Sequence, residues 1–120
     1  MLELPLFPLD LVLLPYESLP LHIFEPRYKK MVKNAIEQDT PFGIILKQGD
    51  EVFRKGCQVE VSKVFKEYKN GEYDILVKGT EPFDVISTKK DGDTIIGNVE
   101  YINLETEGHK TGFQELQDTF

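Results

Sequence analysis

Four prolines interrupt the apolar beginning of the chain, at positions 5, 8, 15 and 20. A proline lacks the N–H that a helix interior requires, so the first 24 residues cannot form one long apolar helix. Prolines are tolerated at the ends, edges and bulges of β-strands. The segment therefore predicts two or three short strands joined by extended connections. The same prolines, and a start without basic residues, argue against a signal peptide, and no apolar span is long enough for a membrane helix.

The hydrophobic period changes at Pro26, where a helix is predicted. Proline suits the first helical turn because its missing N–H would have no partner there. The helix should end near Asp39, since Pro41 disfavours helical geometry at Thr40. Its buried stripe, at spacings of three and four, consists of Tyr28, Met31, Val32, Ala35 and Ile36.

Beyond this helix the apolar residues alternate with polar ones, which is typical of half-buried strands. The pair Asn70-Gly71 favours a two-residue hairpin turn of type I′. The predicted elements are, in order, a buried strand over 42–46, a polar loop over 48–55, a strand from Cys57 with a bulge near 62–65, the hairpin, a strand over 73–77, a turn over 79–82, a strand from Phe83, a turn over 91–93 and a strand over 94–104.

These elements predict a mostly β protein with one main helix, of the α+β class. The architecture we expect is a mostly antiparallel sheet or small barrel plugged by the helix. With 120 residues, the chain has room for one domain over residues 1–120. Phe113, Leu116 and Phe120 are spaced as in a helix, so residues 112–120 predict the start of a second helix.

Charge and cysteine content exclude several classes of protein. The net charge of −7 argues against a partner held mainly by its phosphates, such as duplex nucleic acid. The single cysteine, Cys57, excludes an intramolecular disulfide and any site with several thiolates. We read Cys57 as a small core residue and expect a protein of the reducing cytoplasm.

Catalytic and metal-binding patterns are missing from the sequence. His22 and His109 lie far apart with no ligand-type residue at a metal spacing, so we expect no metal site, and His22 is read as a half-buried strand residue. The serines lie in no motif of a serine nucleophile. Pairs of carboxylates for general acid–base catalysis stay open, although 21 acidic residues supply such pairs by chance. We expect no cofactor.

Two stretches carry candidate contact residues. The first 24 residues hold more large apolar side chains than short strands usually bury, so some of Leu13, Leu14, Tyr16, Leu19 and Phe24 would form an exposed contact patch. The alternative is that they form one wall of the core.

The second stretch has lysines at positions 63, 66 and 69 that alternate with apolar and aromatic residues, a pattern that could contact single-stranded RNA. The acidic chain as a whole favours a solvated strand face instead.

The N-terminal residues resemble a known family. The similarity rests on Leu4-Pro5-Leu6-Phe7-Pro8-Leu9, on Val12-Leu13-Leu14-Pro15, on Leu19-Pro20-Leu21-His22-Ile23-Phe24-Glu25-Pro26-Arg27-Tyr28 and on Met31-Val32. This pattern is similar to the opening of the N-terminal domain of the ATP-dependent protease Lon. The later layout is also similar, except that Glu81-Pro82 stands where the family has an arginine before Phe83.

The resemblance covers essentially the whole chain and implies a pseudo-barrel related to the PUA fold. In the family a helical subdomain follows the barrel, so the resemblance implies that residues 112–120 are the start of that subdomain. In the family this domain is not catalytic. It helps to capture unfolded or tagged polypeptides and supports assembly of the protease ring. The ATPase and peptidase domains lie C-terminal to it and their motifs do not occur here, so the chain is either a fragment of such a protease or a stand-alone homologue.

We therefore predict a polypeptide-binding domain that recruits substrates for ATP-dependent proteolysis. The contact residues of this hypothesis are Leu13, Leu14, Tyr16 and Phe24, with Arg27 at the rim. The family string Glu25-Pro26-Arg27-Tyr28 is interpreted as structural: a carboxylate at the helix start, the first turn, a side chain that pairs with a carboxylate or a carbonyl, and a ring packed on the barrel. The alternatives are a protein-interaction or assembly module, with copies of itself or other protease domains as partners, and an RNA-binding PUA-like domain.

Overall fold

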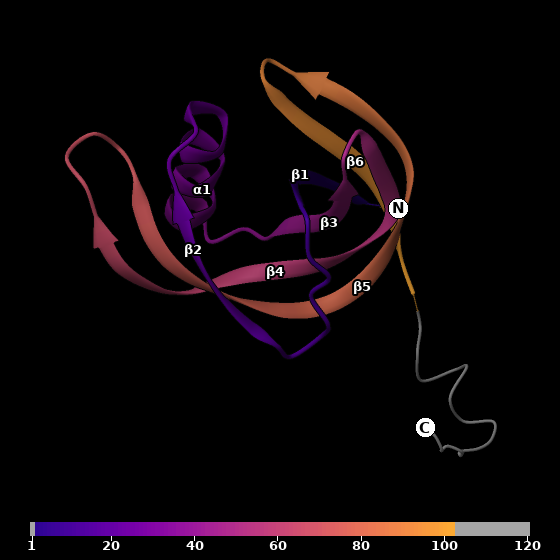
Figure 1. Ribbon diagram of the computed structural model, residues 1–120, viewed down its shortest axis with the longest axis horizontal. Helices are drawn as coiled ribbons and strands as arrows, with labels where there is room; N and C mark the ends of the chain where they lie inside the picture. The colour runs from indigo at the N-terminus through magenta and orange to yellow at the C-terminus, as the bar shows by residue number, and fades with distance from the viewer. Residues whose placement is uncertain (1, 103–120) are drawn as a thin grey trace.

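The computed structural model describes residues 2–102, which form six strands and one helix (Figure 1). The elements are β1 (Leu2–Leu9), β2 (Ser18–Ile23), α1 (Pro26–Gln38), β3 (Phe42–Gln48), β4 (Glu51–Glu67), β5 (Tyr73–Asp91) and β6 (Thr94–Tyr101). The strand order is β2-β5-β4-β3-β1-β6, and β6 also pairs with β5. This last pairing closes five of the strands into a barrel, with β2 outside the ring on β5. The predicted mostly β fold with one main helix is confirmed.

One pairing in the barrel is parallel. Leu6 to Leu9 of β1 run beside Gly43 to Leu46 of β3 in the same direction, whereas every other pair is antiparallel. The connection between these two strands contains β2 and α1, because parallel neighbours need a crossover and cannot be joined by a tight turn.

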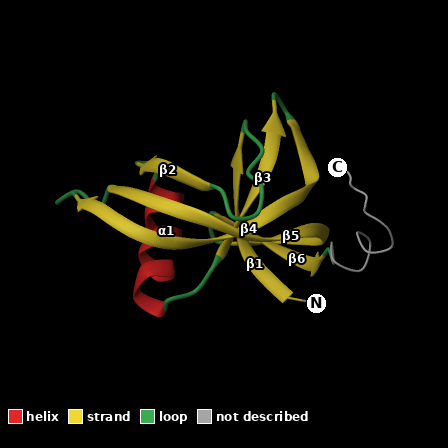
Figure 2. Ribbon diagram, turned by 90° about the horizontal axis from the view of Figure 1, so that it is seen from below, coloured by secondary structure: helices red, strands yellow, loops and turns green. Residues whose placement is uncertain are grey.

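Helix α1 begins at the predicted Pro26 and ends one residue before the predicted limit, at Gln38. Asp39 follows in the left-handed region, with φ of 54°, and its N–H donates to the carbonyl of Ala35. The helix lies on the concave side of the curved β4–β5 ribbon (Figures 1 and 2). The buried stripe is as predicted, with Ile36 partly buried at its margin.

The core has two parts. The larger part lies between α1 and the sheet, where the Tyr28 ring stacks on Phe7 with centroids 4.2 Å apart. The smaller part fills the rest of the barrel around Phe83, whose side chain is fully buried. A Cβ at Gly43 or at Gly56 would lie 2.7 or 2.8 Å from the Phe83 ring, so these glycines make room for it.

Two predicted loops are strands in the structure. Residues 48–55 were expected to be a polar loop, but β4 starts at Glu51 and only Gly49 and Asp50 form the turn. The ladder there needs only main-chain groups, so exposed polar side chains did not prevent a strand. The turn predicted over 79–82 is also wrong, because β5 is continuous from Tyr73 to Asp91. Its irregularity is a register shift against Cys57 and Val59 of β4.

The hairpin at Asn70-Gly71 is confirmed, but its turn type is different. Gly71 has φ of 90°, whereas Asn70 is not among the residues with positive φ, and a type I′ turn needs both. The N–H of Gly71 donates to the carbonyl of Tyr68 and that of Tyr68 to the carbonyl of Glu72. The loop therefore has three residues and ends on a left-handed glycine. The predicted bulge near 62–65 is confirmed by two register shifts in β4.

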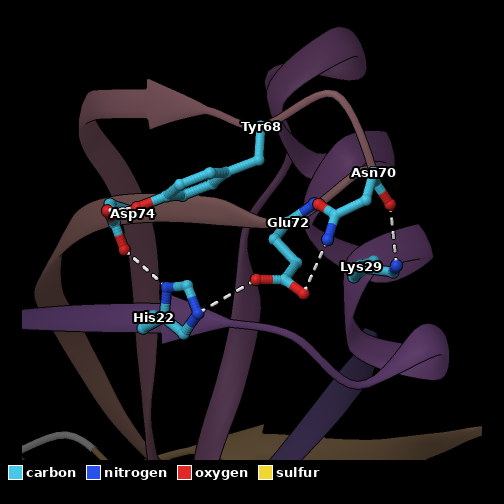
Figure 3. Close-up of polar contacts among 6 residues, drawn as sticks. All are labelled: His22, Lys29, Tyr68, Asn70, Glu72 and Asp74. Carbon is cyan, nitrogen blue, oxygen red and sulfur yellow. Dashed lines mark hydrogen bonds and ion pairs between the residues drawn. The ribbon is translucent and has the colours of Figure 1, made fainter.

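A histidine on β2 joins that strand to the tip of the β4–β5 hairpin (Figure 3). His22 Nδ1 lies 2.6 Å from Asp74 Oδ1, and Nε2 lies 3.1 Å from Glu72 Oε1. The Tyr68 hydroxyl donates to the other oxygen of Asp74, at 2.5 Å. The side chain of His22 is about half exposed, at 48%.

The same cluster reaches the helix. Lys29 of α1 donates to the main-chain carbonyl of Asn70, and the Asn70 amide donates to the Glu72 carboxylate. The hydrogen bond to Asp74 raises the pKa of His22 above 6.5. Hydrogen bonds from Tyr68 and His22 lower the pKa of Asp74. The cluster of His22, Asp74, Glu72, Asn70 and Lys29 thus links β2, the hairpin and α1.

These two pKa shifts predict a pH dependence of stability. The contribution of His22 is complete below its unfolded pKa and is lost as the pH rises through the raised folded value. That of Asp74 is complete above its unfolded pKa and is lost as the pH falls through the lowered folded value. The cluster should therefore contribute fully only between about pH 4 and pH 6.5. NMR titration of the His22 ring, assigned by its loss in His22→Gln, should give a raised pKa that returns toward 6.5 in Asp74→Asn. An ordinary pKa in both proteins would contradict this.

The smaller part of the core predicts a large mutational effect. Phe83→Ala should lower the free energy of unfolding by about 3–5 kcal/mol, because a fully buried ring is replaced by a cavity. Ile86→Ala, on the same strand but exposed, should change it by less than about 1 kcal/mol. Chemical denaturation of both variants measures the difference, and equal effects would show that Phe83 does not hold the barrel closed.

Candidate functional site

The loop between β1 and β2 borders a small apolar pocket. Residues 11–15 form one side of it, and Ile44, Leu46, Phe53 and Cys57 contribute from β3 and β4. The pocket has a volume of about 220 Å3, and Lys55 is the one charged residue that lines it. It is therefore suited to an apolar group of modest size.

Hydrogen bonds to β5 fix the end of this loop. The N–H of Tyr16 donates to the carbonyl of Gly79 at 2.9 Å, and the N–H of Gly79 donates to the carbonyl of Glu17 at 2.8 Å. The Glu17 carboxylate accepts from the N–H of Leu14 at 2.8 Å. Tyr16 has φ of 71°, a left-handed conformation that is uncommon for a bulky residue. The turn over 14–17 thus holds its side chains in set directions.

Alternate residues of the loop point to opposite sides. Val12, Leu14 and Tyr16 are 65%, 56% and 79% exposed, and we call these three residues the loop patch. Leu13 is only 8% exposed and belongs to the larger part of the core, so its predicted exposure is wrong. Leu19, on β2, is partly buried against the same core. The loop covers the barrel with one set of side chains and presents the other to solvent.

Phe24 and Arg27 lie at the other end of β2. Phe24 is exposed, with its ring centroid 6.0 Å from that of His22. Arg27 Nη2 lies 3.6 Å from a Glu25 carboxylate oxygen, and the guanidinium lies 4.7 Å from the centroid of the Tyr28 ring. The six residues of β2 span roughly 20 Å, so the predicted contact residues form two groups instead of one.

Each residue of Glu25-Pro26-Arg27-Tyr28 has a defined position at the start of α1. Glu25 is the N-cap of α1 and makes no side-chain capping hydrogen bond, although its carbonyl accepts from Tyr28 and Lys29. Pro26 opens the first turn. Tyr28 is buried, and burial raises the pKa of its hydroxyl.

The predictions from sequence missed one residue of this pocket. Phe53 lines it but lies in the stretch expected to be a polar loop. The adjacent apolar pair Val52-Phe53 within that polar stretch was the available signal. Cys57 is a small core residue, as predicted, and burial raises the pKa of its thiol.

The described residues were also compared with the requirements of a metal site and of a membrane-spanning helix. Within residues 2–102, no group of three or more His, Cys, Asp or Glu side chains is placed to hold a metal ion. No helix in that part of the chain has the length and apolar character needed to cross a membrane.

Comparison with known proteins finds similar solved structures and a similar sequence. A crystal structure of a Lon N-terminal domain protein from Xanthomonas campestris superimposes with a TM-score of 0.76 at 28% sequence identity, over 86% of this chain and 61% of that one. The N-terminal domain of a Mycobacterium avium complex Lon protease has the same fold, with a TM-score of 0.66 at 14% identity, over 84% of this chain and 55% of that one. Protein cereblon of Xenopus tropicalis is 29% identical in an alignment over 99 residues that covers 78% of this chain and 22% of cereblon.

The chain thus spans less than two thirds of each of these proteins. The resemblance seen in the N-terminal residues extends along the sequence, because the family model of the ATP-dependent protease La (LON) substrate-binding domain matches residues 3–120. The chain belongs to the LON substrate-binding domain family.

Proposed function

We propose that this domain captures extended, apolar-rich segments of protein substrates for ATP-dependent proteolysis, and that it binds them without acting on them chemically. The observation that carries the proposal is the loop patch: large apolar side chains lie exposed on a turn that hydrogen bonds hold in place. Membership of a substrate-binding domain family supports it.

The size of the pocket favours a polypeptide over a small molecule. Pockets for small ligands usually measure about 300–1,000 Å3, whereas the one beside the loop measures about 220 Å3. A single apolar side chain of a bound segment would fill it, while the rest of the segment contacts the loop patch.

The two groups of exposed residues lie at opposite ends of β2. A bound segment about six residues long in an extended conformation covers roughly 20 Å, which is the length of β2, the strand between the two groups. Arg27 at the far end would then meet a polar group of the segment. Contacts at two ends would allow short segments of varied sequence to bind.

Binding at a single domain should be weak. The fixed turn lowers the entropy lost on binding, but few side chains are involved. Several copies in one assembly would raise the effective affinity without any new contact. Oligomerisation, through this chain or through attached protease domains, is therefore part of the proposal.

The double variant Leu14→Ser, Tyr16→Ser tests the loop patch. Its affinity for a permanently unfolded, apolar-rich polypeptide should fall roughly tenfold or more, because hot-spot side chains of this kind each contribute at least about 1 kcal/mol. Amide shift titration of the isotope-labelled domain measures the affinity and maps the contact.

The matched control is Ile86→Ser, which removes an exposed apolar side chain far along β5 and should leave the affinity unchanged. Equal affinities of the double variant and the original protein would contradict the assignment. A stoichiometric complex with a folded protein, without binding to the unfolded one, would favour an interaction or assembly module instead.

A further inference from the structure

Strand β4 has an open edge over its second half. Strand β3 pairs with β4 only as far as Phe42 and Val59, whereas β5 pairs with β4 out to Glu67. Strand β2 lies on the opposite side of β5. Within the part of the chain that the structure describes, residues 60–67 therefore have a strand neighbour on one side only. We call this segment the β4 edge.

An open strand edge is a main-chain binding site. Outward N–H and C=O groups of a strand edge can pair with another extended chain, and this is the basis of peptide binding by strand addition. Two register shifts, between Val61 and Lys63 and between Val64 and Lys66, divide the β4 edge into short stretches, so a guest strand would pair with the main-chain groups on either side of them. The hydrogen bonds involve only the main chain of the guest, so they tolerate a wide range of guest sequences.

A groove lies beside this edge and leaves room for a guest. It has a volume of about 320 Å3 and is lined by residues 60–64 of β4 and by the C-terminal end of α1 with Thr40 and Pro41. Val64 and Phe65 are exposed on the edge itself, where the alternate side chains of an added strand would lie.

Residues 63–69, at the outer end of the β4 edge, carry three lysines and one carboxylate, Glu67, in an otherwise acidic protein. Lys63 and Lys66 lie over the rings of Phe65 and Tyr68, at 5.2 and 4.6 Å from the centroids. Across residues 2–102, neither these lysines nor Lys69 form an ion pair with a carboxylate. The carboxylates of Asp39 and Glu60 line the groove at the other end of the edge. A guest with carboxylates would be attracted to the three lysines.

We infer that the β4 edge binds an extended apolar polypeptide segment carrying carboxylates, as an added strand. The inference rests on the proposed capture of polypeptides and adds a second contact, separate from the loop patch. RNA phosphates would also meet the lysines, but the net charge of −7 and the open main-chain edge favour a polypeptide.

The test uses the labelled domain and a short peptide that alternates valine with glutamate. Amides of residues 60–67 should shift and their hydrogen exchange should slow on titration. The same peptide with N-methyl groups along one edge should bind about tenfold more weakly, because it loses donors of the added strand. Lys63→Glu with Lys66→Glu should weaken binding to a similar degree. Lys47→Glu with Lys90→Glu, two exposed lysines elsewhere, should leave it unchanged.

Each other outcome overturns the inference. Shifts at the loop patch alone would leave polypeptide capture standing and remove the β4 edge from it. Equal binding of the N-methylated peptide would exclude strand addition. Binding of a single-stranded oligouridylate at the lysines, without binding of the peptide, would replace the polypeptide with RNA. No binding of this peptide or of the unfolded polypeptide would remove the proposed function as well.

Discussion

The structure depends on strand β5. Its 19 residues pair with β2, β4 and β6. A single strand therefore closes the barrel and also carries the part of the β4–β5 hairpin that extends beyond it. A strand of this length must bend to do both. The register shifts against β4 and the shift between Val85 and Ser87 against β6 provide local twist at those points. The larger and smaller parts of the core lie along the same strand, with Ile75 and Val77 in one and Phe83 and Val85 in the other.

The proposed binding surfaces follow from this strand. The main chain of Gly79 in β5 holds the turn that presents Leu14 and Tyr16, and the pairing of β5 with β4 leaves the outer edge of β4 without a second neighbour. The hairpin that carries this edge is attached to β2 through His22 and to α1 through Lys29. A rigid scaffold with exposed apolar and main-chain groups suits a domain that must accept segments of varied sequence, because the scaffold pays little entropy on binding.

Local signals predicted part of this arrangement and failed where tertiary contacts decide. Pro26 and the apolar stripe after it predict the helix, and Asn70-Gly71 predicts the hairpin. Both predictions hold because each signal acts on only a few neighbouring residues. The sequence around Gly79 predicts a turn. In the structure this glycine lies within β5, and its lack of a side chain allows the close approach of the Leu14 carbonyl. The residues next to Gly79 in the sequence give no sign of that contact. Leu13 and Leu14 are adjacent and have the same side chain, so the sequence does not distinguish them. The path of the loop buries Leu13 and exposes Leu14. The second helix predicted over 112–120 lies outside the described residues.

The central claim is that β5 sets the geometry of the loop patch and that this geometry binds polypeptide. Gly79→Ala tests it directly, since the added Cβ would lie 2.6 Å from the Leu14 carbonyl oxygen and must displace the turn. The measurement is the affinity of this variant for an unfolded apolar-rich polypeptide, read by amide shifts. The account predicts unchanged shifts in β1, β3 and β6, altered shifts at Leu14 and Tyr16, and an affinity roughly tenfold lower. A displaced turn with unchanged affinity would contradict it.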